Sequence, residues 1–211
     1  MKLARSASAR DSSASTQESI LATARTLFAQ KGYSATSTQE IARAAGVNKR
    51  LIFYYFEDKE KLYMATLEEF FSRVEGFLQN FQIKEQDLSD PWLALLRFSD
   101  NIIRFISQQR EPVLILMREI MDEGPLLEQI TECYIRPTLS AAESYFKEIL
   151  GQDGNLQGRD VHHLLLSLGG ANLLYFIALP LLTRIWDLDP NAPEILEERK
   201  QTMRRFILRS L

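Results

Sequence analysis

The sequence predicts an all-α fold, and three observations lead to this prediction. From Thr16 onward, apolar residues recur at spacings of three and four along most of the chain. No segment shows the strict apolar–polar alternation, bounded by turn residues, that is typical of strands. Residues that begin or end helices, such as Gly, Pro and capping Ser, Asn or Asp, separate the periodic segments. About nine helices are expected in the 211 residues.

Composition and motifs exclude several classes of protein. With 45% hydrophobic and 25% charged residues, the chain is not expected to be disordered as a whole. Cys133 is the single cysteine, which excludes a disulfide framework or a Cys-rich zinc module and favours a reducing compartment, the cytoplasm. The neighbouring His162 and His163 point about 100° apart on a helix, so no metal site is expected. Without a P-loop, G-x-G-x-x-G or G-x-S-x-G motif, no cofactor and no enzyme activity are expected.

The charge is unevenly distributed along the chain. Residues 1–60 contain nine Lys and Arg against six Asp and Glu, which gives +3, whereas the whole chain carries −3. The remaining residues therefore carry −6. A basic front part and an acidic remainder indicate that the first segment meets a polyanion and the second does not.

The first eighty residues predict an arm followed by four helices. Residues 1–15 are small, polar and aperiodic and lack the apolar segment of a secretory signal, so a flexible arm with a solvated terminus is favoured over one that contacts DNA. A first helix ends at Gly32. Ser37-Thr-Gln-Glu40 is a capping box that begins a short helix, which Gly46 ends. Asn48 caps a third helix, and Asp58 caps a long fourth one.

Helices at 38–45 and 49–56, joined by a tight turn at Gly46, have the layout of a helix-turn-helix, whose second helix enters the major groove of DNA. Glycine suits this turn because a Cβ is costly where the chain reverses so tightly. Apolar residues of both helices are expected to hold them crossed. The outward positions then carry hydroxyl, amide, cationic and apolar side chains of the kinds that contact phosphates and base edges: Thr38, Gln39, Lys49, Arg50, Leu51 and Tyr55.

The later helices include a long apolar one. Pro91 begins a helix, a short helix follows Glu111-Pro112, and the next runs to about Leu150 with a kink or break at Pro137. GQDGNLQG is predicted to be a loop. Residues 164–182 carry no charge; we favour a helix between its own core and a partner subunit over a membrane span. The final helix, 194–211, supports an isologous dimer interface through one apolar side: Leu196, Met203, Ile207 and Leu211.

The segment Thr36–Lys61, TSTQEIARAAGVNKRLIFYYFEDKEK, resembles the DNA-binding domain of the TetR family of bacterial transcriptional regulators. The upstream ARTLFAQKGYSAT is similar to the family's first helix and its Gly-aromatic turn, so the resemblance covers about residues 16–65. Beyond Tyr63 only the helical architecture is similar.

The resemblance implies roles for individual residues. Thr38 and Tyr55 match phosphate-contacting positions, and Lys59 matches a lysine that contacts the DNA backbone. Gln39, Lys49, Arg50 and Leu51 fall where the family reads bases. Arg50 and Leu51 depart from the family's small and hydroxyl residues, so a different operator is expected.

Three aromatic residues of the third helix are interpreted separately. Phe53 replaces the family's usual Tyr and lacks a phosphate-contacting hydroxyl, which Tyr54 is expected to supply. For Phe53 and Phe56, packing in the core is favoured, since so small a domain needs aromatic residues to bury enough area.

In the family that this sequence resembles, the region after the DNA-binding domain encloses an effector cavity. Aromatic, Met and polar residues here fit either such a pocket or a solid core. For Arg118 and Asn172, orienting an effector and a purely structural ion pair or cap stay equally open. The candidate pocket residues are Phe98, Phe105, Met117, Arg118, Met121, Tyr145, Asn172 and Phe176.

The sequence therefore predicts a flexible arm at 1–15, a helix-turn-helix domain at 16–62 and an effector-binding and dimerisation domain at 63–211. The resemblance implies a homodimeric cytoplasmic repressor that a small apolar effector releases from a palindromic operator. Two alternatives are a helical interaction or scaffold protein that does not bind DNA, and a regulator tethered to a membrane.

Overall fold

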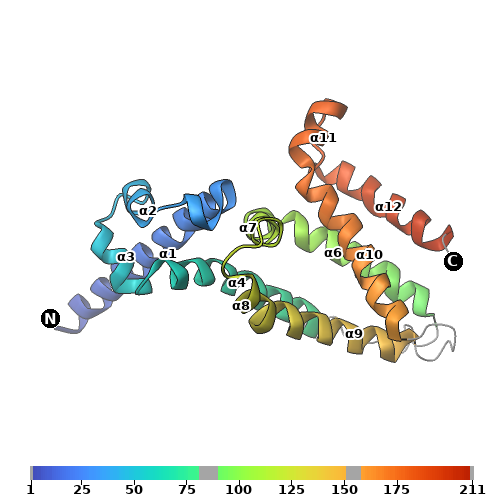
Figure 1. The fold of residues 1–211 in the computed structure, drawn as a ribbon, viewed down its shortest axis with the longest axis horizontal. Coiled ribbons are helices and arrows are strands. Elements are labelled where there is room, and N and C mark those ends of the chain that lie inside the picture. The colour runs from blue at the N-terminus through green and yellow to red at the C-terminus, as the bar shows by residue number, and fades with distance from the viewer. Residues whose placement is uncertain (1, 81–89, 151–157, 210–211) are drawn as a thin grey trace. The chain divides into compact units, whose positions relative to one another are not determined.

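The computed structural model describes the chain except for residues 1, 81–89, 151–157 and 210–211 (Figure 1). Within the described ranges, every regular element is a helix, which confirms the all-α prediction. Residues 151–157 of the predicted loop GQDGNLQG lie outside these ranges, as does Leu211, whereas its last residue, Gly158, begins a helix. The elements are α1 Lys2–Ala35, α2 Thr38–Ala44, α3 Lys49–Phe56, α4 Lys59–Asn80, α6 Pro91–Ser107, α7 Arg110–Met121, α8 Leu127–Ile130, the π-helix η1 Thr131–Ile135, α9 Arg136–Leu150, α10 Gly158–Ile177, α11 Leu179–Trp186 and α12 Pro193–Arg209.

The chain folds into two compact units that do not divide at residue 62. We call Met1–Arg73 with Glu111–Thr131 the first unit, and Val74–Arg110 with Glu132–Leu211 the second unit. Residues 111–131 therefore pack with the N-terminal helices, although they follow α6 in the sequence. Helix α4 is continuous and contributes to both units.

Helix α1 is longer than the sequence analysis predicts. Its backbone is helical from Lys2, through the segment for which a flexible arm is expected. Ala, Arg and Lys have good helix propensity, so this segment continues the helix without an apolar periodicity of its own. The predicted end is present: Gly32 has a φ of 79°, which interrupts the helical backbone and which glycine adopts without a Cβ clash.

Apolar side chains of α1 to α4 form the core of the first unit. Ile41, Ile52 and Phe56 are buried, as expected for residues that hold a helix-turn-helix together. The other fully buried side chains in α1 and α4 include Ile20, Phe28, Leu62, Tyr63 and Leu67.

The second unit is built around one hydrophobic cluster, in which α6 contacts α9, α10 and α12. Met203 and Ile207 of α12 are in this cluster, and Leu196 packs against it. This apolar side of the last helix thus faces its own core, so the prediction that Leu196, Met203 and Ile207 line a dimer interface is wrong. Periodicity identifies the apolar side of a helix but not the partner that covers it.

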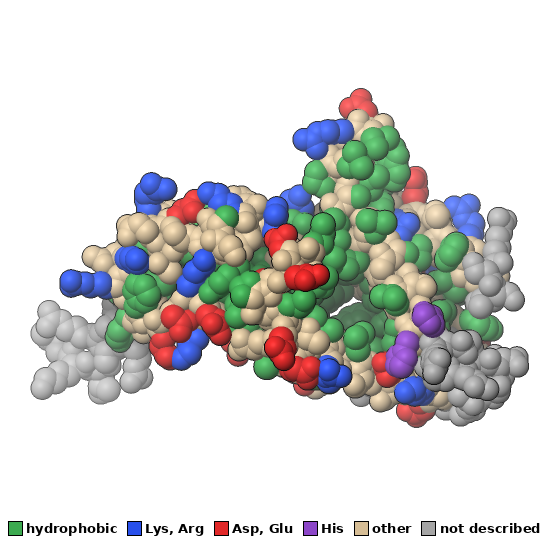
Figure 2. Space-filling model, in the orientation of Figure 1, with side chains coloured by type: hydrophobic (Ala, Val, Ile, Leu, Met, Phe, Trp, Pro, Cys, Tyr) green, Lys and Arg blue, Asp and Glu red, His purple; other side chains and the backbone are tan. Residues whose placement is uncertain are grey.

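The predicted apolar helix at 164–182 breaks at Ala178. Pro180 cannot continue the hydrogen-bonding of α10, and α11 starts with a bend of 64° to the preceding helix. No single helix in the described residues is long and apolar enough to cross a membrane; only this bent pair passes that test, by length and composition. Figure 2 shows hydrophobic side chains on the surface of α11, where Leu181, Ile185 and Trp186 are exposed.

The helical backbone changes type, rather than ending, near the predicted kink or break at Pro137. The π-helix Thr131–Ile135 ends where α9 begins, and Pro137 is the second residue of α9. Proline has no N–H to donate to the preceding turn, and the change of helix type lies directly before it.

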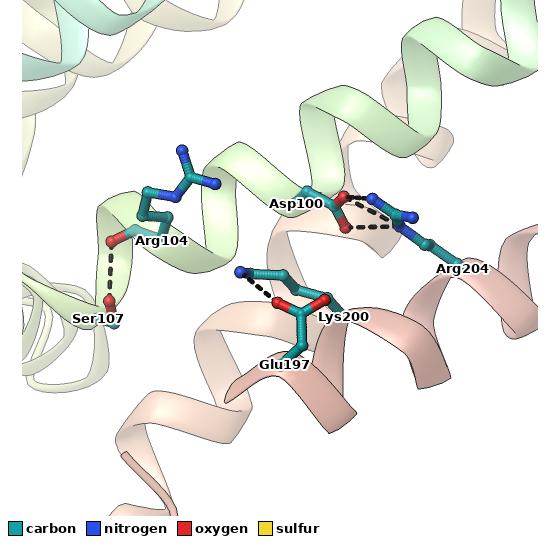
Figure 3. Close-up of polar contacts among 6 residues, drawn as sticks. All are labelled: Asp100, Arg104, Ser107, Glu197, Lys200 and Arg204. Carbon is teal, nitrogen blue, oxygen red and sulfur yellow. Dashed lines mark hydrogen bonds and ion pairs between the residues drawn. The ribbon is translucent and has the colours of Figure 1, made fainter. Parts of the chain in front are cut away.

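An ion pair joins α6 to α12 in the second unit (Figure 3). The guanidinium of Arg204 donates to both carboxylate oxygens of Asp100, with Nε 3.0 Å from Oδ2 and 3.3 Å from Oδ1. The carboxylate raises the pKa of Arg204. The Asp100 side chain is only 12% exposed and that of Arg204 is 51% exposed. The guanidinium therefore compensates the charge of a nearly buried carboxylate.

Candidate DNA interface

The turn between α2 and α3 is fixed by backbone and capping hydrogen bonds. Gly46 has a φ of 67°, and the N–H of Val47 donates to the carbonyl of Ala42 at 2.9 Å. Ser37 Oγ accepts from the N–H of Glu40 at 3.1 Å, and Asn48 Oδ1 accepts from that of Arg50 at 2.9 Å. Both predicted caps are therefore present, and they set where each helix begins.

The predicted base-reading residues lie on the outside of α2 and α3. Gln39, Lys49 and Arg50 are exposed, whereas Thr38 and Leu51 are half-buried. Lys49 Nζ lies 5.5 Å from the ring centroid of Phe53, one helical turn further along α3. The geometry gives α3 two exposed cationic side chains in its first turn, next to the amide of Gln39 on α2.

The aromatic residues of α3 divide between the core and the surface. Phe56 is buried, as expected, but Phe53 is 44% exposed, so the prediction that Phe53 packs in the core is wrong. Phe53 follows Ile52, which occupies the buried position, and one residue of rotation turns Phe53 outward. Tyr54 is 76% exposed. Tyr55 is half-buried and packs edge-on against Tyr54, with centroids 5.1 Å apart.

Lys59, at the start of α4, lies over an aromatic ring. Its Nζ is 4.1 Å from the ring centroid of Tyr33, and burial lowers the pKa of this lysine. Such a cation–π contact contributes about 0.5–2 kcal/mol, depending on how far the cation is desolvated. Sequence reasoning missed Tyr33 as a residue of this surface. The Gly32-Tyr33 pair was the available signal, because a backbone reversal after α1 returns the aromatic ring to the helices that follow.

Charged side chains of both signs lie on the described surface of the first unit (Figure 2). Two acidic residues near the helix-turn-helix are already paired: Glu40 with Lys31 at 2.5 Å, and Glu57 with Lys61. The hydrogen bond from Lys31 lowers the pKa of Glu40. Pairing neutralises carboxylates that would otherwise repel a phosphate backbone.

The predicted effector residues do not all come together. Phe98, Phe105 and Tyr145 are linked in the second unit through Phe77 and ring contacts: Phe98 lies 6.0 Å from Phe77 and 6.5 Å from Tyr145, and Phe105 lies 5.3 Å from Phe77. Phe176 is buried in the same hydrophobic cluster.

Asn172 is fully buried in the second unit. Its Nδ2 donates to the carbonyl of Leu168 at 2.9 Å, and its Oδ1 accepts from Arg199 at 3.5 Å. The guanidinium of Arg199 also lies 5.0 Å from the ring centroid of Tyr175. A structural role accounts for the hydrogen bonds of Asn172, and its part in orienting an effector stays a prediction.

Met117, Arg118 and Met121 belong to the first unit, apart from the other candidate effector residues. Arg118 is exposed, and its Nε donates to the carbonyl of Ala29 on α1 at 2.9 Å. Met121 is 75% exposed. Helix α7 packs with the N-terminal helices, and a shared effector pocket of these residues with Phe98 stays a prediction.

Two of the grooves on the described surface are lined by residues other than the predicted effector residues. A groove of about 430 Å³ lies between α1 and α4, beside the Arg25–Glu69 ion pair. A second, of about 560 Å³, lies in the second unit and is lined by Arg110, Leu179, Pro180, Thr183, Arg184, Asp189 and Asn191.

Comparison with known proteins agrees with this geometry. Residues 20–66 match the family model of bacterial regulatory proteins of the tetR family, and residues 91–211 match the C-terminal domain of the HTH-type transcriptional dual regulator CecR. The probable HTH-type transcriptional regulator YttP of Bacillus subtilis is 25% identical over 85% of this chain and 86% of its own length. The HTH-type transcriptional repressor NicS of Pseudomonas putida is 32% identical over 52% of this chain and 50% of its own length.

Solved structures show the same fold. A TetR-like transcriptional regulator from Rhodococcus sp. RHA1 has a TM-score of 0.65 at 16% identity, covering 92% of this chain and 94% of that one. The hemolysin II transcriptional regulator HlyIIR has a TM-score of 0.58 at 26% identity, covering 82% and 96%. The chain belongs to the TetR family of DNA-binding transcriptional regulators.

Proposed function

We propose that the protein is a repressor that binds a pseudo-palindromic operator as a homodimer and is released by a small apolar effector. The observation that carries the DNA-binding part is the exposed first turn of α3. Lys49 and Arg50 project from a helix whose start is fixed by the Asn48 cap, so their backbone positions are set before DNA arrives. Pre-organised side chains lose less conformational freedom on binding.

The roles of the other surface residues follow from their chemistry. Arg50 reads guanine by two hydrogen bonds, and Leu51 contacts a thymine methyl group. Thr38, Tyr54, Tyr55 and Lys59 contact phosphates, which position the protein on the duplex. A regulator with this interface works in the cytoplasm, where the chromosome lies.

A homodimer is supported by the apolar surface that α10 leaves exposed. Leu166, Gly170 and Leu174 follow one another at four-residue spacing and are exposed, with Leu166 at 72% and Leu174 at 66%. A Cβ placed on Gly170 would meet nothing within 4 Å, so there is room for close approach of a second helix. The two half-sites that a helix-turn-helix dimer binds lie about 34 Å apart on the duplex.

Release by an effector is supported by the continuity of α4. This helix begins with Lys59 in the first unit and continues into the second, where Phe77 contacts Phe98 and Phe105. An effector that enters this aromatic cluster would favour the state with weaker DNA affinity, by typically 1–3 kcal/mol.

Selection of bound duplexes from a random DNA pool tests the proposal. We expect a pseudo-palindromic site, and an affinity for it that falls linearly on a log–log plot as salt is raised. The alternative of a helical scaffold predicts no enrichment and no salt-dependent DNA binding, and either result would reject the repressor assignment. A screen of apolar compounds for loss of binding to the selected site then tests the effector.

A further inference from the structure

A chain of side-chain contacts leads from a buried carboxylate on α7 to Lys59. The ammonium of Lys59 lies over the ring of Tyr33, and among the described residues no carboxylate forms an ion pair with it. The ammonium is thus available to a phosphate. The Tyr33 ring restricts the position of the ammonium, because the four-carbon lysine side chain is flexible and has many rotamers open to it.

Tyr33 is in turn held by Tyr63 of α4. The two rings meet edge-on with centroids 5.1 Å apart, and Tyr63 also packs edge-on against Phe28 at 4.8 Å. The Tyr63 side chain is 1% exposed. Its hydroxyl needs a partner at this depth, and it donates to Glu119 Oε2 at 2.8 Å.

Glu119 is fixed on its other side by the turn after α7. It is 3% exposed, and its Oε1 accepts from the N–H of Leu126 at 2.7 Å. Gly124 leaves the room that the carboxylate occupies: a Cβ there would lie 2.3 Å from Glu119 Cδ.

Two further hydrogen bonds hold α7 against α1 in the first unit. Glu111 Oε1 accepts from Thr26 at 2.8 Å, and Arg118 Nε donates to the carbonyl of Ala29 at 2.9 Å. Together with the Glu119–Tyr63 bond, they place the carboxylate in one position relative to the N-terminal helices.

We propose that Glu119 and Tyr63 are positioning residues for DNA binding: they hold the Tyr33 ring beneath Lys59 and so set the ammonium for a phosphate. This inference rests on the proposed phosphate contact of Lys59. No DNA contact is proposed for Tyr33, Tyr63 or Glu119 themselves. The part of the chain that follows α6 thereby takes part in the DNA interface through residues 111–131.

A double-mutant cycle with Lys59→Ala tests the proposal, with binding to non-operator duplex DNA measured over a range of salt. Lys59→Ala lowers the salt slope by about one. Tyr63→Phe and Glu119→Gln each weaken binding about three- to fivefold in the wild-type background, and by less than about 1.5-fold when Lys59 is already Ala. Residues that act through one side chain lose their effect once it is removed.

Variants of Tyr33 separate the ring from its hydroxyl. Tyr33→Leu removes the surface beneath the ammonium and reproduces most of the Lys59→Ala effect, whereas Tyr33→Phe keeps the ring and binds as the wild type does. Tyr175→Phe is the matched control, because its buried hydroxyl donates to the carbonyl of Pro190 at 2.6 Å in the second unit. It leaves DNA affinity and the salt slope unchanged, although it too removes a buried hydrogen bond.

The outcomes distinguish the phosphate contact of Lys59 from the positioning role of Tyr63 and Glu119. If Lys59→Ala leaves the salt slope unchanged, the proposed phosphate contact is wrong and the positioning role falls with it. If Lys59→Ala lowers the slope but Tyr63→Phe weakens binding equally in both backgrounds, or Tyr175→Phe weakens it as much as Tyr63→Phe does, only the positioning role is wrong.

Discussion

The two compact units place their candidate functional residues in different ways. In the first unit, the predicted DNA-contacting residues lie between Thr38 and Lys59, within two short helices and the start of a third. Their positions are set by local bonds, such as the Asn48 cap and the Val47–Ala42 hydrogen bond. In the second unit, the candidate effector residues come from helices far apart in the sequence, and only packing brings them together.

This difference explains which kind of functional residue a sequence reveals. A local motif determines its own geometry, so a residue two positions from a cap has a known direction. A pocket depends on how several helices cross, and periodicity does not determine which helices meet. Helix α7 is an example: periodicity does not indicate that it packs with the helices of the first unit.

The substitution with the largest expected effect tests whether the exposed apolar surface of α10 in the second unit forms the dimer interface. Leu174→Asp places an unpaired charge in the proposed contact between two α10 helices, which costs several kcal/mol and produces monomers by analytical ultracentrifugation. Leu173 is half-buried within its own chain, so Leu173→Asp disturbs folding as well as association. Leu139→Asp, at a leucine of α9 that is 48% exposed, leaves the oligomeric state unchanged. A Leu174→Asp protein that sediments as the wild type does would remove α10 from the interface.

Arg50→Ala tests whether the first unit reads sequence through α3. A bidentate contact to guanine contributes about 1–3 kcal/mol of discrimination, so operator affinity falls about ten- to a hundredfold and one base pair per half-site becomes tolerant. Non-specific affinity changes by only a few-fold. If Arg50 merely neutralises a phosphate, specific and non-specific binding fall together. Parallel site selection with the wild type, Arg50→Ala and the distant control Arg136→Ala decides between the two.

Arg204→Met tests how the second unit joins its helices. The substitution leaves the nearly buried carboxylate of Asp100 without its partner, which costs about 1–3 kcal/mol of unfolding free energy. Asp100→Asn leaves an exposed guanidinium instead and costs less, about 0–1 kcal/mol. Urea unfolding at one protein concentration measures both. If both variants lose the same unfolding free energy, the burial of Asp100 does not determine how much the loss of the ion pair destabilises the protein.

The helix-turn-helix was predictable from the sequence almost to the residue. Gly46, the Ser37 and Asn48 caps and the buried Ile41 and Ile52 are all where the pattern placed them. Each depends on bonds within about four residues, which the sequence displays directly.

Contacts over longer distances could not be predicted in the same way. The Tyr63–Glu119 hydrogen bond joins residues 56 positions apart. The apolar side of α12 packs in the hydrophobic cluster of the second unit, which the sequence of α12 alone does not indicate. The outward direction of Phe53 was within reach, because Ile52 and Phe56 already fill the buried side of α3. It was missed because an aromatic residue in a small domain is usually needed in the core.

Tyr54→Phe gives the smallest expected effect and tests whether one exposed hydroxyl replaces another. The family resemblance implies a tyrosine at the position of Phe53, and Tyr54 is the more exposed of the two residues, at 76% against 44%. The substitution keeps the ring contact with Tyr55 and removes only the oxygen. Loss of one phosphate hydrogen bond weakens binding to all DNA sequences about two- to fivefold. Phe53→Tyr restores a hydroxyl next to it, and in the Tyr54→Phe background it recovers the affinity if the two positions reach the same phosphate. Unchanged binding by both single variants would show that neither hydroxyl position contacts the backbone, and that Thr38, Tyr55 and Lys59 suffice.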